Sequence, residues 1–315
     1  MARYLEQRLK IRHLRVIDAI EQHKSVLRAS QALMISQPAL TRTLQEVEEM
    51  VGGELFERHS RGMHVNDVGM LMTAGARKLL VTLREMEDDL GQLVDRQRRV
   101  IRVGALPVAA HGLLPAVLAS ASGLSAQLRI ELIEGRTDQL LPALAKGEID
   151  VIVGRLYTPA IPDDFVRRVL YQEPISLIAR TDHPLFALPA PTPDDVRRFP
   201  LVLPAVSTLM ERDVRALLGA IGLIPDDAIQ SSSVGFMREL LLSGNFVTAM
   251  PRILVAGDLA RDMLRIVPIG LAAHDRPAGL MYRDQLGAAG TILLAEIARE
   301  LSRLEDSDIV TLVNP

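Results

Sequence analysis

The chain is organised around residues 26–61, which read VLRASQALMISQPALTRTLQEVEEMVGGELFERHSR. Two short helical segments meet here at a tight turn, Met34-Ile35-Ser36, and a longer helix begins at Gln37-Pro38. Ser36 is a good N-cap because its hydroxyl can accept a hydrogen bond from an unpaired first-turn N–H. Pro38 suits the first turn, where no intrahelical donor is needed. The pattern predicts two helices joined by a short turn.

The longer helix has two unlike faces. Apolar residues recur at i, i+4, i+7 and i+11 and predict a stripe packed on a core: Leu40, Leu44, Val47 and Val51. The opposite face carries Gln37, Thr41, Gln45 and Glu48, with Arg42 beside them. Neutral hydrogen-bonding side chains and an arginine can contact base edges in a major groove and phosphates. We interpret the segment as a helix-turn-helix whose second helix enters DNA, although polar-faced helices after a turn are common in other soluble proteins.

The segment that follows favours the DNA-binding interpretation. Residues 55–65 read LFERHSRGMHV and predict a short two-stranded wing that turns at Gly62. Arg58, His59 and Arg61 lie around its tip. Basic side chains at this place would lie along a phosphate backbone or in a minor groove.

These residues resemble one known family. The segments that carry the resemblance are Ala29-Ser30, Ser36-Gln37-Pro38-Ala39-Leu40-Thr41-Arg42, Glu46-Val47-Glu48, Gly52-Gly53, Leu55-Phe56-Glu57-Arg58 and Gly69. They are similar to the winged helix-turn-helix of the LysR-type transcriptional regulators, and the similarity extends over nearly the whole chain. The runs Val103-Gly104-Ala105-Leu106-Pro107 and Val153-Gly154-Arg155-Leu156 resemble the branch that contains regulators of protocatechuate catabolism and of a galactose-binding protein.

Composition and charge agree with a globular regulator. The 315 residues are long enough for two or three domains, with 48% apolar and 24% charged residues. The chain has no cysteine, which excludes disulfides and thiolate metal sites. A net charge of +2 over residues 1–66 contrasts with −5 over the remainder, which fits a DNA-reading head on an acidic body. With a polar N-terminus and short apolar runs, we expect a cytoplasmic protein.

Helical periodicity continues on both sides of the helix-turn-helix. Residues 11–21 predict a first helix packed behind it, and Ser25 could cap a second helix over residues 26–33. Arg28 is exposed by this spacing, either to reach a phosphate or simply to face solvent. After the wing, Asn66 or Asp67 can cap a long helix that runs to about residue 97.

The long helix carries a heptad pattern. Apolar residues follow each other at spacings of 4, 3, 4, 3, 4 and 3: Met72, Ala76, Leu79, Leu83, Met86, Leu90 and Leu93. Such a seam is buried best by a second copy of itself, although a single helix packed on its own protein is the alternative. We predict a dimerising linker that places two heads on one duplex, and therefore an inverted-repeat operator.

Beyond a charged hinge at residues 96–99 the pattern alternates between strands and helices. Strands at 101–103, 128–133 and 150–153 alternate with helices at 113–120 and 137–146, which predicts an open, mostly parallel sheet. A second run has strands near 175–179, 201–203, 228–230 and 246–249 and helices near 208–221, 234–242 and 251–260. Strands at 264–267 and 279–282 should return to the first lobe, and 291–304 should be a closing helix.

The predicted architecture therefore has three parts. An α+β winged helix-turn-helix domain covers residues 1–66 and a linker or dimerisation helix covers 67–98. Residues 99–315 form an α/β effector domain of two lobes, lobe I at about 99–170 and 265–315 and lobe II at about 171–264. Two α/β lobes joined by crossing strands are similar to periplasmic binding proteins, and the resemblance to LysR-type regulators implies the same fold.

A small effector is expected in the cleft, at the carboxyl ends of strands and near helix starts. The candidate contacts are Leu106, Pro107, Arg136, Thr137, Arg155, Ser207, Thr208 and Thr248. Helix starts favour an anion, and Arg155 could pair with a carboxylate or else form an ion pair on the lobe surface. Ser207 and Thr208 are either ligand contacts or helix caps. Many family members carry a hydroxyl residue where this chain has Ala105-Leu106-Pro107, so a polar contact is not expected at that loop.

The sequence contains no phosphate loop, dinucleotide fingerprint, metal-spaced histidine pair or nucleophile elbow, so we expect neither an enzyme nor a cofactor or metal. His183, before Pro184, is interpreted as a turn residue. The leading hypothesis is a transcriptional regulator that binds double-stranded DNA and a small, anionic effector. The resemblance implies a homodimer or homotetramer and contact with RNA polymerase. The rival is a solute-binding or enzymatic α/β protein. An aromatic carboxylate, its ring-cleavage product and a sugar all remain open as effectors.

Overall fold

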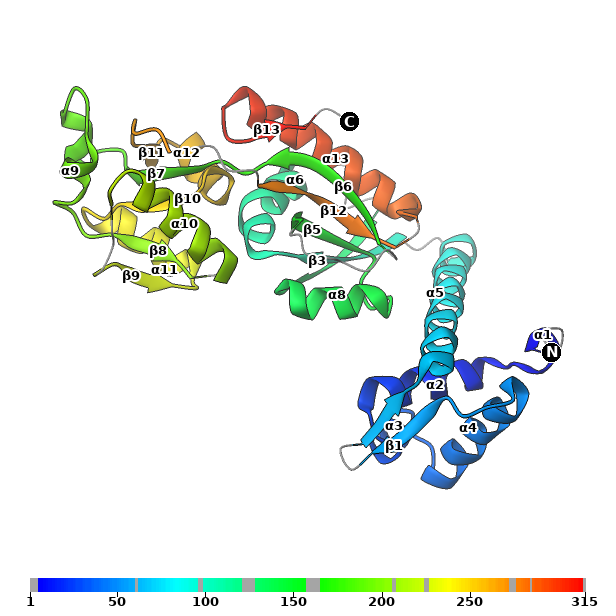
Figure 1. Cartoon of the computed structure of the whole chain (residues 1–315). Coiled ribbons are helices and arrows are strands. Elements are labelled where there is room, and N and C mark those ends of the chain that lie inside the picture. Colours follow the sequence, from blue (N-terminus) through cyan, green and yellow to red (C-terminus); the bar gives the residue numbers. More distant parts are fainter. Residues whose placement is uncertain are drawn as a thin grey trace. The chain divides into compact units, whose positions relative to one another are not determined.

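The computed structural model describes residues 5–59, 62–95, 99–120, 128–156, 165–205, 208–223, 227–271, 276–283 and 285–313. The chain divides into two compact units, which we call the head unit (residues 1–97 with 145–147) and the body unit (98–144 with 148–315). Figure 1 colours the chain along the sequence, so that the head unit is blue to cyan. Each unit is described by itself.

The head unit is mostly helical, with one short hairpin. Its elements in chain order are α1 (Leu5–Arg8), α2 (Ile11–His23), α3 (Val26–Ala32), α4 (Gln37–Val51), β1 (Phe56–His59), β2 (Gly62–Val65) and α5 (Asp67–Asp95). Helices α3 and α4 are the two helices of the predicted helix-turn-helix, and β1 with β2 is the predicted wing (Figure 1). Both predictions are confirmed.

Local chemistry sets the ends of the two central helices. The Ser25 hydroxyl accepts a hydrogen bond from the Arg28 N–H, and the Ser36 hydroxyl accepts one from the Ala39 N–H, each at 3.4 Å. Met34 turns the chain between the helices with a φ of 53°, and α4 ends at Gly52 with a φ of 82°. The cap expected at Ser36 is therefore present.

The apolar stripe of α4 packs on α2. Leu40 and Val47 are fully buried together with Ile17 and Ile20 of α2 and with Leu55, which precedes the wing. Truncating one such leucine to alanine costs about 2–5 kcal/mol, so a few side chains account for much of the head unit's stability. The stripe also fixes which face of α4 points away from the core.

The wing is attached to the helices through backbone contacts. Strands β1 and β2 pair antiparallel, with Phe56 opposite Val65. The Met63 N–H donates to the Lys24 carbonyl at 3.0 Å, which ties β2 to the end of α2. A Cβ at Gly69 would lie 2.1 Å from the Leu55 carbonyl oxygen, so only glycine allows α5 to approach the wing this closely.

Helix α5 starts on the head and is fixed to α2. The Asn66 side chain accepts a hydrogen bond from the Gly69 N–H at 2.9 Å, as expected of an N-cap. Ala76 and Leu80 bury themselves against Leu14 of α2. Arg77 donates to Asp18 at 2.7 Å and also pairs with Glu21, so two carboxylates of α2 hold one guanidinium of α5.

The heptad seam divides into two parts. Met72 packs against the head core and Ala76 is buried, so this part of the predicted dimer seam is wrong and belongs to the subunit's own head. Leu79, Met86 and Leu90 are 54%, 55% and 55% exposed and lie on one side of α5 at helical spacing. The side chain of Leu93 lies outside the described residues.

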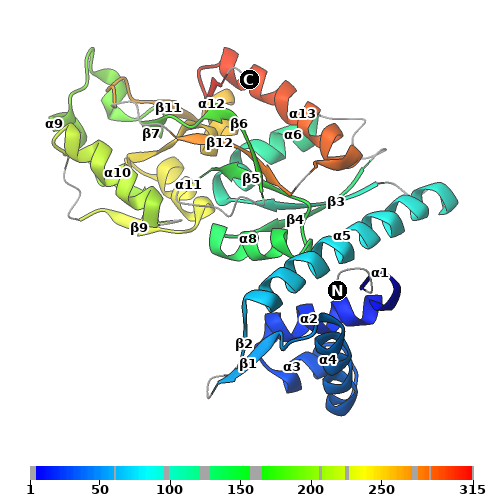
Figure 2. The same cartoon turned by 45° about the vertical axis from the view of Figure 1, so that its right-hand side comes forward.

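The first lobe of the body unit is built on a six-stranded sheet. Its elements are β3 (Arg99–Ala105), η2 (Ala109–Leu113), α6 (Leu114–Ser120), β4 (Leu128–Glu134), α8 (Thr137–Ala145), β5 (Val151–Arg155), β6 (Val166–Gln172), β12 (Pro277–Tyr282), α13 (Gly287–Asp306) and β13 (Thr311–Leu312). The strand order is β13-β6-β12-β5-β3-β4. Helices α6 and α13 cover one face and α8 covers the other (Figures 1 and 2).

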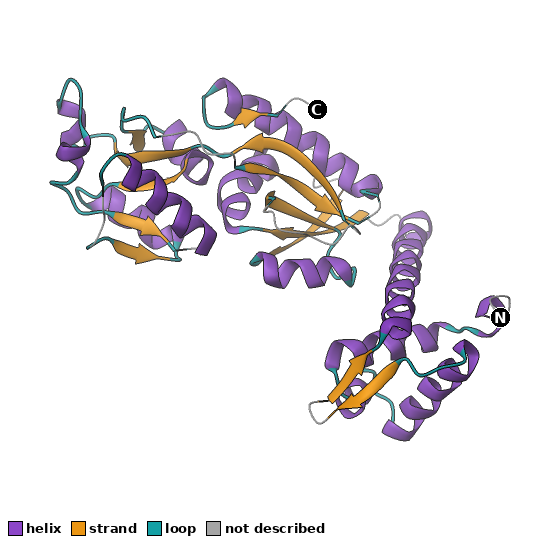
Figure 3. Cartoon of the chain, in the orientation of Figure 1, coloured by secondary structure: helices purple, strands orange, loops and turns teal. Residues whose placement is uncertain are grey.

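The second lobe is smaller. Its elements are β7 (Ile175–Arg180), η3 (Pro184–Ala187), α9 (Pro193–Val196), β8 (Val202–Pro204), α10 (Thr208–Ala220), β9 (Ile229–Ser231), α11 (Val234–Ser243), β10 (Thr248–Pro251), η4 (Arg252–Val255), α12 (Ala256–Ala260) and β11 (Leu264–Ile266). Strands β10-β7-β11 form one sheet, β8 pairs with β9, and Leu201 bridges to Val247. In Figure 3 the strands of each lobe lie among helices, the α/β arrangement predicted from the sequence.

Three predictions about the body need correction. Strand β11 pairs with β7 inside the second lobe and does not return to the first. The six-stranded sheet of the first lobe is not mostly parallel as predicted, because β4-β3 and β3-β5 are parallel pairs whereas β5-β12, β12-β6 and β6-β13 are antiparallel. Residues 251–260 are two short helices, η4 and α12. Sequence analysis did not predict β6, because its residues include two consecutive arginines and lack a continuous apolar run.

Among the helices described, none is long and apolar enough to cross a bilayer.

The contact between Arg77 and α2 predicts a pH dependence. Burial alone would raise the pKa of Glu21, but hydrogen bonds from Lys24 and Arg77 and the charge of Arg77 outweigh it and hold the pKa below 4.5. A carboxyl with a lowered folded pKa stabilises the fold above its unfolded pKa and loses this effect as pH falls through the folded value. We expect Glu21→Gln to lower the unfolding free energy at pH 7 by about 1 kcal/mol or less.

Chemical denaturation of the full chain at several pH values measures this effect. The difference between wild type and Glu21→Gln should shrink as the pH falls below about 4.5, near the unfolded pKa of the group. Glu49→Gln, which removes an exposed carboxylate of α4, is the control. An equal difference at pH 7 and in acid would contradict the role given to the Glu21 charge.

Candidate DNA-reading surface and effector site

Helix α4 presents an uncovered polar face. Ser36, Gln37, Pro38, Arg42 and Gln45 are exposed and Thr41 is half-buried. Within the described part of the head unit, the side chains of Gln37, Thr41, Arg42 and Gln45 form no hydrogen bond or ion pair. A partner can therefore bind these side chains without breaking a hydrogen bond inside the described head unit. The structure thus brings together those residues of α4 and its N-cap that the sequence assigned to DNA reading.

The other residues predicted to contact DNA lie on α3 and on the wing, and the structure describes only some of them. Arg28 of α3 is exposed. The side chain of Arg58 and all of Arg61 lie outside the described residues, so the wing's basic tip is known only from its strands. His59 lies at its end, with its Nε2 3.2 Å from Glu57 and its ring 5.1 Å from that of His64.

A small polar clamp that the sequence did not predict holds α4 on α2. The Glu46 carboxylate accepts a hydrogen bond from Arg12 at 2.7 Å and lies 3.1 Å from Nε2 of His13, which is almost fully buried. The hydrogen bond with His13, followed by that from Arg12, lowers the pKa of Glu46. Glu46 lies on a flank of α4 away from Thr41, so the clamp sets the roll of the helix without covering the reading face.

In the body unit, three of the predicted effector loops meet at one edge of the first lobe's sheet. The Leu106 N–H donates to the Val153 carbonyl at 3.0 Å, and the Gly135 N–H donates to the Ala105 carbonyl at 3.1 Å. These bonds place the ends of β3, β4 and β5 together, as expected for a parallel sheet. Arg155 is the last residue of β5 and stands at this edge.

The individual candidates differ in their surroundings. Leu106 is buried against Gly154, where a Cβ would lie 2.7 Å from the Leu106 Cβ, and Pro107 is half-buried. Arg136 is exposed with its Nε 3.5 Å from Asp138, and Thr137, the first residue of α8, is half-buried. Residues 105–107, where many family members carry a hydroxyl residue, therefore form an apolar loop in this chain.

The candidates of the second lobe are less informative. Thr248 is fully buried in β10, and its hydroxyl has no hydrogen-bond partner in the part of the chain that is described. Ser207 lies outside the described residues, as does the side chain of Thr208, which begins α10. His183 is confirmed as a turn residue, because its Nδ1 accepts a hydrogen bond from the Leu185 N–H at 3.1 Å.

Arg155 belongs to a buried charged cluster, which we call the hinge cluster and define as Arg155, Glu173, Asp213 and Arg276. Arg155 and Arg276 each donate from Nη1 to the same oxygen of Asp213, at 2.6 Å. Arg276 Nη2 lies 3.7 Å from Glu173, and Tyr171 donates to Glu173 at 3.5 Å. The side chains of Arg276 and Glu173 are 1% and 0% exposed.

The hinge cluster joins parts that are distant in sequence. Arg155 ends β5 in the first lobe, Asp213 is on α10 in the second, and Glu173 and Arg276 lie on the two segments that connect the lobes. Burial raises the pKa of Glu173, although the positive charges of Arg276 and Arg155 oppose this. Sequence analysis found Arg155 but missed the other three, because no local spacing marks residues that meet only through the tertiary fold.

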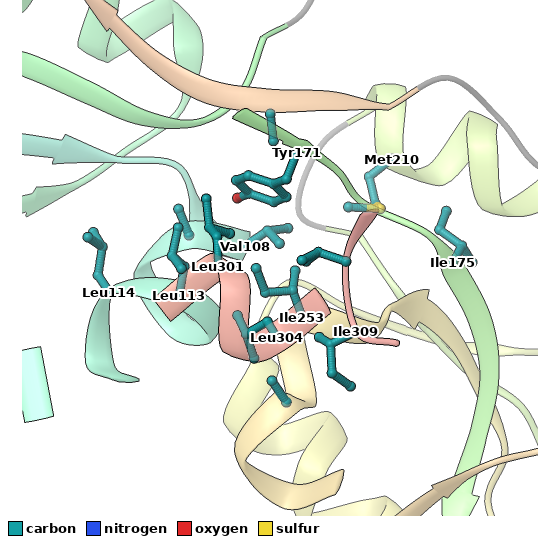
Figure 4. Packing of buried hydrophobic residues seen from close by; sticks show 14 of the residues in the cluster. Val108, Leu113, Leu114, Tyr171, Ile175, Met210, Ile253, Leu301, Leu304 and Ile309 are labelled. Atoms are coloured by element: carbon teal, nitrogen blue, oxygen red, sulfur yellow. The ribbon is translucent and has the colours of Figure 1, made fainter. Parts of the chain in front are cut away.

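Apolar contacts also connect the lobes. Figure 4 shows Val108 and Leu113 of the first lobe in one buried cluster with Met210 and Ile253 of the second. A Cβ at Gly112 would lie 2.2 Å from the Ile253 carbonyl oxygen, so η2 and η4 approach each other as closely as two backbones allow. The lobes are therefore held both by this apolar contact and by the hinge cluster.

A cavity of about 660 Å³ lies along the two connecting segments. Its wall combines apolar residues such as Ile175, Leu217 and Ile266 with polar or charged ones, which are Gln172, Ser176, Arg252, Arg276, Asp308 and Thr311. Its volume lies in the range of about 300–1,000 Å³ that is typical of small-ligand sites. Among the described residues, no group of histidines and carboxylates could hold a metal ion.

Comparison with known proteins identifies the family. The model of the bacterial regulatory helix-turn-helix of the lysR family matches residues 11–70, and that of the LysR substrate-binding domain matches residues 95–300. The chain belongs to the LysR family of transcriptional regulators, which are DNA-binding proteins with an effector-binding domain and not enzymes.

Individual relatives agree with this assignment. The transcriptional regulator PcaQ of Agrobacterium fabrum is 29% identical over 299 residues, 94% of this chain and 96% of that protein. GbpR of Azospirillum brasilense is 30% identical over 247 residues, 78% and 72% of the two chains. Both belong to the branch predicted from the sequence. A full-length OxyR variant from Pseudomonas aeruginosa has the same fold, with a TM-score of 0.61 at 21% identity over 98% of this chain and 99% of that one.

The exposed face of α4 generates a direct prediction. Gln37→Ala, Thr41→Ala and Arg42→Ala should each weaken DNA binding by roughly tenfold or more, because each removes a contact worth about 1–3 kcal/mol. The melting temperature should change little, since none of these side chains is bonded within the described head unit. Fluorescence anisotropy with a labelled operator and a thermal melt measure the two quantities.

Thr43→Ala is the matched control. Thr43 is on the same helix but lies toward Glu46, away from Thr41, and its hydroxyl donates to the Ala39 carbonyl at 3.0 Å. This variant should keep DNA affinity. If Thr43→Ala weakens binding as much as Thr41→Ala, or if the three variants melt well below wild type, the assignment of the reading face is wrong.

Proposed function

We propose that this LysR-family regulator binds an inverted-repeat operator as a homodimer or homotetramer and is controlled by a small organic anion held between its two lobes. The uncovered polar face of α4 is the observation that carries the DNA-binding part. Residues 1–66 would read DNA, 67–98 would pair subunits and 99–315 would bind the effector. Such a protein works in the cytoplasm and contacts RNA polymerase at the promoter.

The anionic character of the effector is supported by the charges at the lobe junction. Arg155, whose side chain is 13% exposed, and Arg276, which is 1% exposed, place two guanidinium groups beside the edge where strands β3, β4 and β5 end. Arginine pairs well with carboxylates because its planar group matches their geometry. Among an aromatic acid, its ring-cleavage product and a sugar, this arrangement favours the two acids.

A mobility-shift series with the duplex upstream of the protein's own gene tests the DNA-binding part. Binding should be at least tenfold tighter to an inverted repeat than to random duplex at the same salt concentration, because phosphate contacts alone do not discriminate sequence. Scrambling one half-site should reduce affinity while leaving the other half-site contacts in place. Equal affinity for repeat and random duplex would refute the proposal.

Pairing through α5 generates a further prediction. Leu79, Met86 and Leu90 form an exposed apolar strip, and a groove of about 510 Å³ beside it is lined by Leu5, Leu9 and Ile11. A second copy of α5 would cover this surface. The double variant Met86→Glu with Leu90→Glu should therefore shift the mass measured by light scattering to that of a monomer.

Ala74→Glu serves as the control, because it places the same charge on an exposed position of α5 to one side of the strip. This variant should keep the mass of wild type. The prediction that α5 pairs two subunits would be contradicted by a wild-type protein that is monomeric at micromolar concentration, or by a double variant that stays oligomeric.

A further inference from the structure

The turn between α3 and α4 carries a large apolar side chain that the head unit does not bury. Met34 is 92% exposed, the highest value among the large apolar residues that the structure describes. The preceding residue, Leu33, packs against the core of the head unit, so the chain leaves the core at Met34. All six residues from Met34 to Ala39 are exposed. The surface around the start of α4 is therefore open to a partner.

This surface carries no charged side chain. Residues 29–41 include neither an acid nor a base, whereas Arg28 and Arg42 flank them on either side. Phosphates are contacted by basic and other polar groups, which the side chains of Met34 and Ile35 do not provide. In the major groove, an apolar side chain finds a matching surface in the C5-methyl group of thymine. The chemistry of the turn thus favours a base over the DNA backbone as its partner.

The backbone of the turn would suit glycine better than methionine. Met34 has a φ of 53°, in the left-handed region, where a side chain costs energy that glycine avoids. The N–H of Met34 donates to the Gln31 carbonyl at 3.1 Å, and that of Ile35 donates to the Ser30 carbonyl at 3.0 Å. These backbone bonds hold the turn without help from the methionine side chain. The side chain is therefore accounted for better by a contact outside the chain than by the fold of the head unit.

Met34 lies within reach of the bases that α4 would read. A recognition helix contacts base edges with its N-terminal residues, and Gln37 is the first residue of α4. Because an extended chain spans roughly 3.6 Å per residue, the Cα atoms of Met34 and Gln37 are at most about 11 Å apart. Successive bases of one strand are about 3.4 Å apart along the duplex, so this span corresponds to roughly three base pairs. Met34 can therefore contact a base close to the one that Gln37 contacts.

We propose that Met34 is a specificity-determining residue whose side chain contacts the C5-methyl group of a thymine in each half-site of the operator. This inference rests on the proposed function, because it concerns the half-sites that α4 reads. The thioether side chain is flexible and polarisable, so it adapts its shape to the methyl group. The contact removes both apolar groups from water and favours thymine over a base that lacks the methyl group.

Replacement of single thymines by deoxyuridine tests the contact, because uracil pairs like thymine but lacks the C5-methyl group. Fluorescence anisotropy of the full chain with the operator measures affinity, with one thymine of one half-site replaced at a time. At one of these thymines the replacement should weaken wild-type binding about fourfold, the effect of losing one buried methyl-sized group. Met34→Gly should not respond to this replacement, and it should bind the unmodified operator about fourfold more weakly for each half-site.

Two further variants separate a contact with DNA from a structural role. Glycine accepts a φ of 53°, so Met34→Gly should melt within a few degrees of wild type. Met34→Leu keeps an apolar side chain and should keep the response to deoxyuridine, a rescue that a purely structural role does not predict. Met70→Ala is the matched control, because Met70 is a 52% exposed methionine of the same unit on α5. It should bind both duplexes as wild type does.

A second measurement does not require a known operator. Duplexes of random sequence can be selected for binding to wild type and to Met34→Gly, and the bound duplexes sequenced. Wild type should enrich thymine at one position of the half-site, and Met34→Gly should lose this enrichment while it keeps the preferences at the other positions. A loss of preference at every position would mean that residue 34 acts through α4 as a whole, and the proposal would be overturned.

The proposal is also overturned if no thymine replacement weakens wild-type binding, if Met34→Gly responds to deoxyuridine as wild type does, or if Met70→Ala loses the response. A failure of the proposed function has a different sign, which is equal affinity of wild type for the inverted repeat and for random duplex. In that case the selected duplexes take the place of the operator in the deoxyuridine experiment.

Discussion

The burial of one apolar stripe determines what the head unit can do. Leu40 and Val47 of α4 pack on Ile17 and Ile20 of α2, and this contact turns the other face of the helix outward. Because the side chains of a helix are fixed at 100° intervals, burying one side exposes Gln37, Arg42 and Gln45 as a group. The clamp formed by Arg12, His13 and Glu46 then limits how far α4 can roll on α2. The exposure of this polar face is thus a consequence of core packing.

The body unit follows a different principle. Its lobes are held by a continuous apolar contact and by a charged cluster that depends on four separate parts of the chain. The apolar contact contributes through the area it buries, whereas the charged cluster adds specificity in how the parts meet. Arg276 is central because it belongs to the charged cluster and to the cavity wall.

Helix α5 shows how tertiary packing divides a pattern that is uniform in sequence. Its heptad seam predicts one continuous pairing surface, but the part near the wing is used by the head itself. Arg77, which is off the seam, fixes this part to α2 through Asp18 and Glu21. Among the seam side chains that the structure describes, Leu79, Met86 and Leu90 remain exposed as a strip. Periodicity identifies which residues will be buried but not which partner buries them.

The sequence by itself determined the helix-turn-helix, the wing, the long helix and the alternation of strands and helices, because caps, turns and apolar periods are local signals. It also identified the polar face of α4 and Arg155. Only the tertiary structure decided that β11 stays in the second lobe, and that Arg155 shares Asp213 with Arg276 above a buried Glu173. The residues of that cluster are up to 121 positions apart, from Arg155 to Arg276. Contacts of this range depend on how whole elements pack, and no short stretch of sequence encodes them.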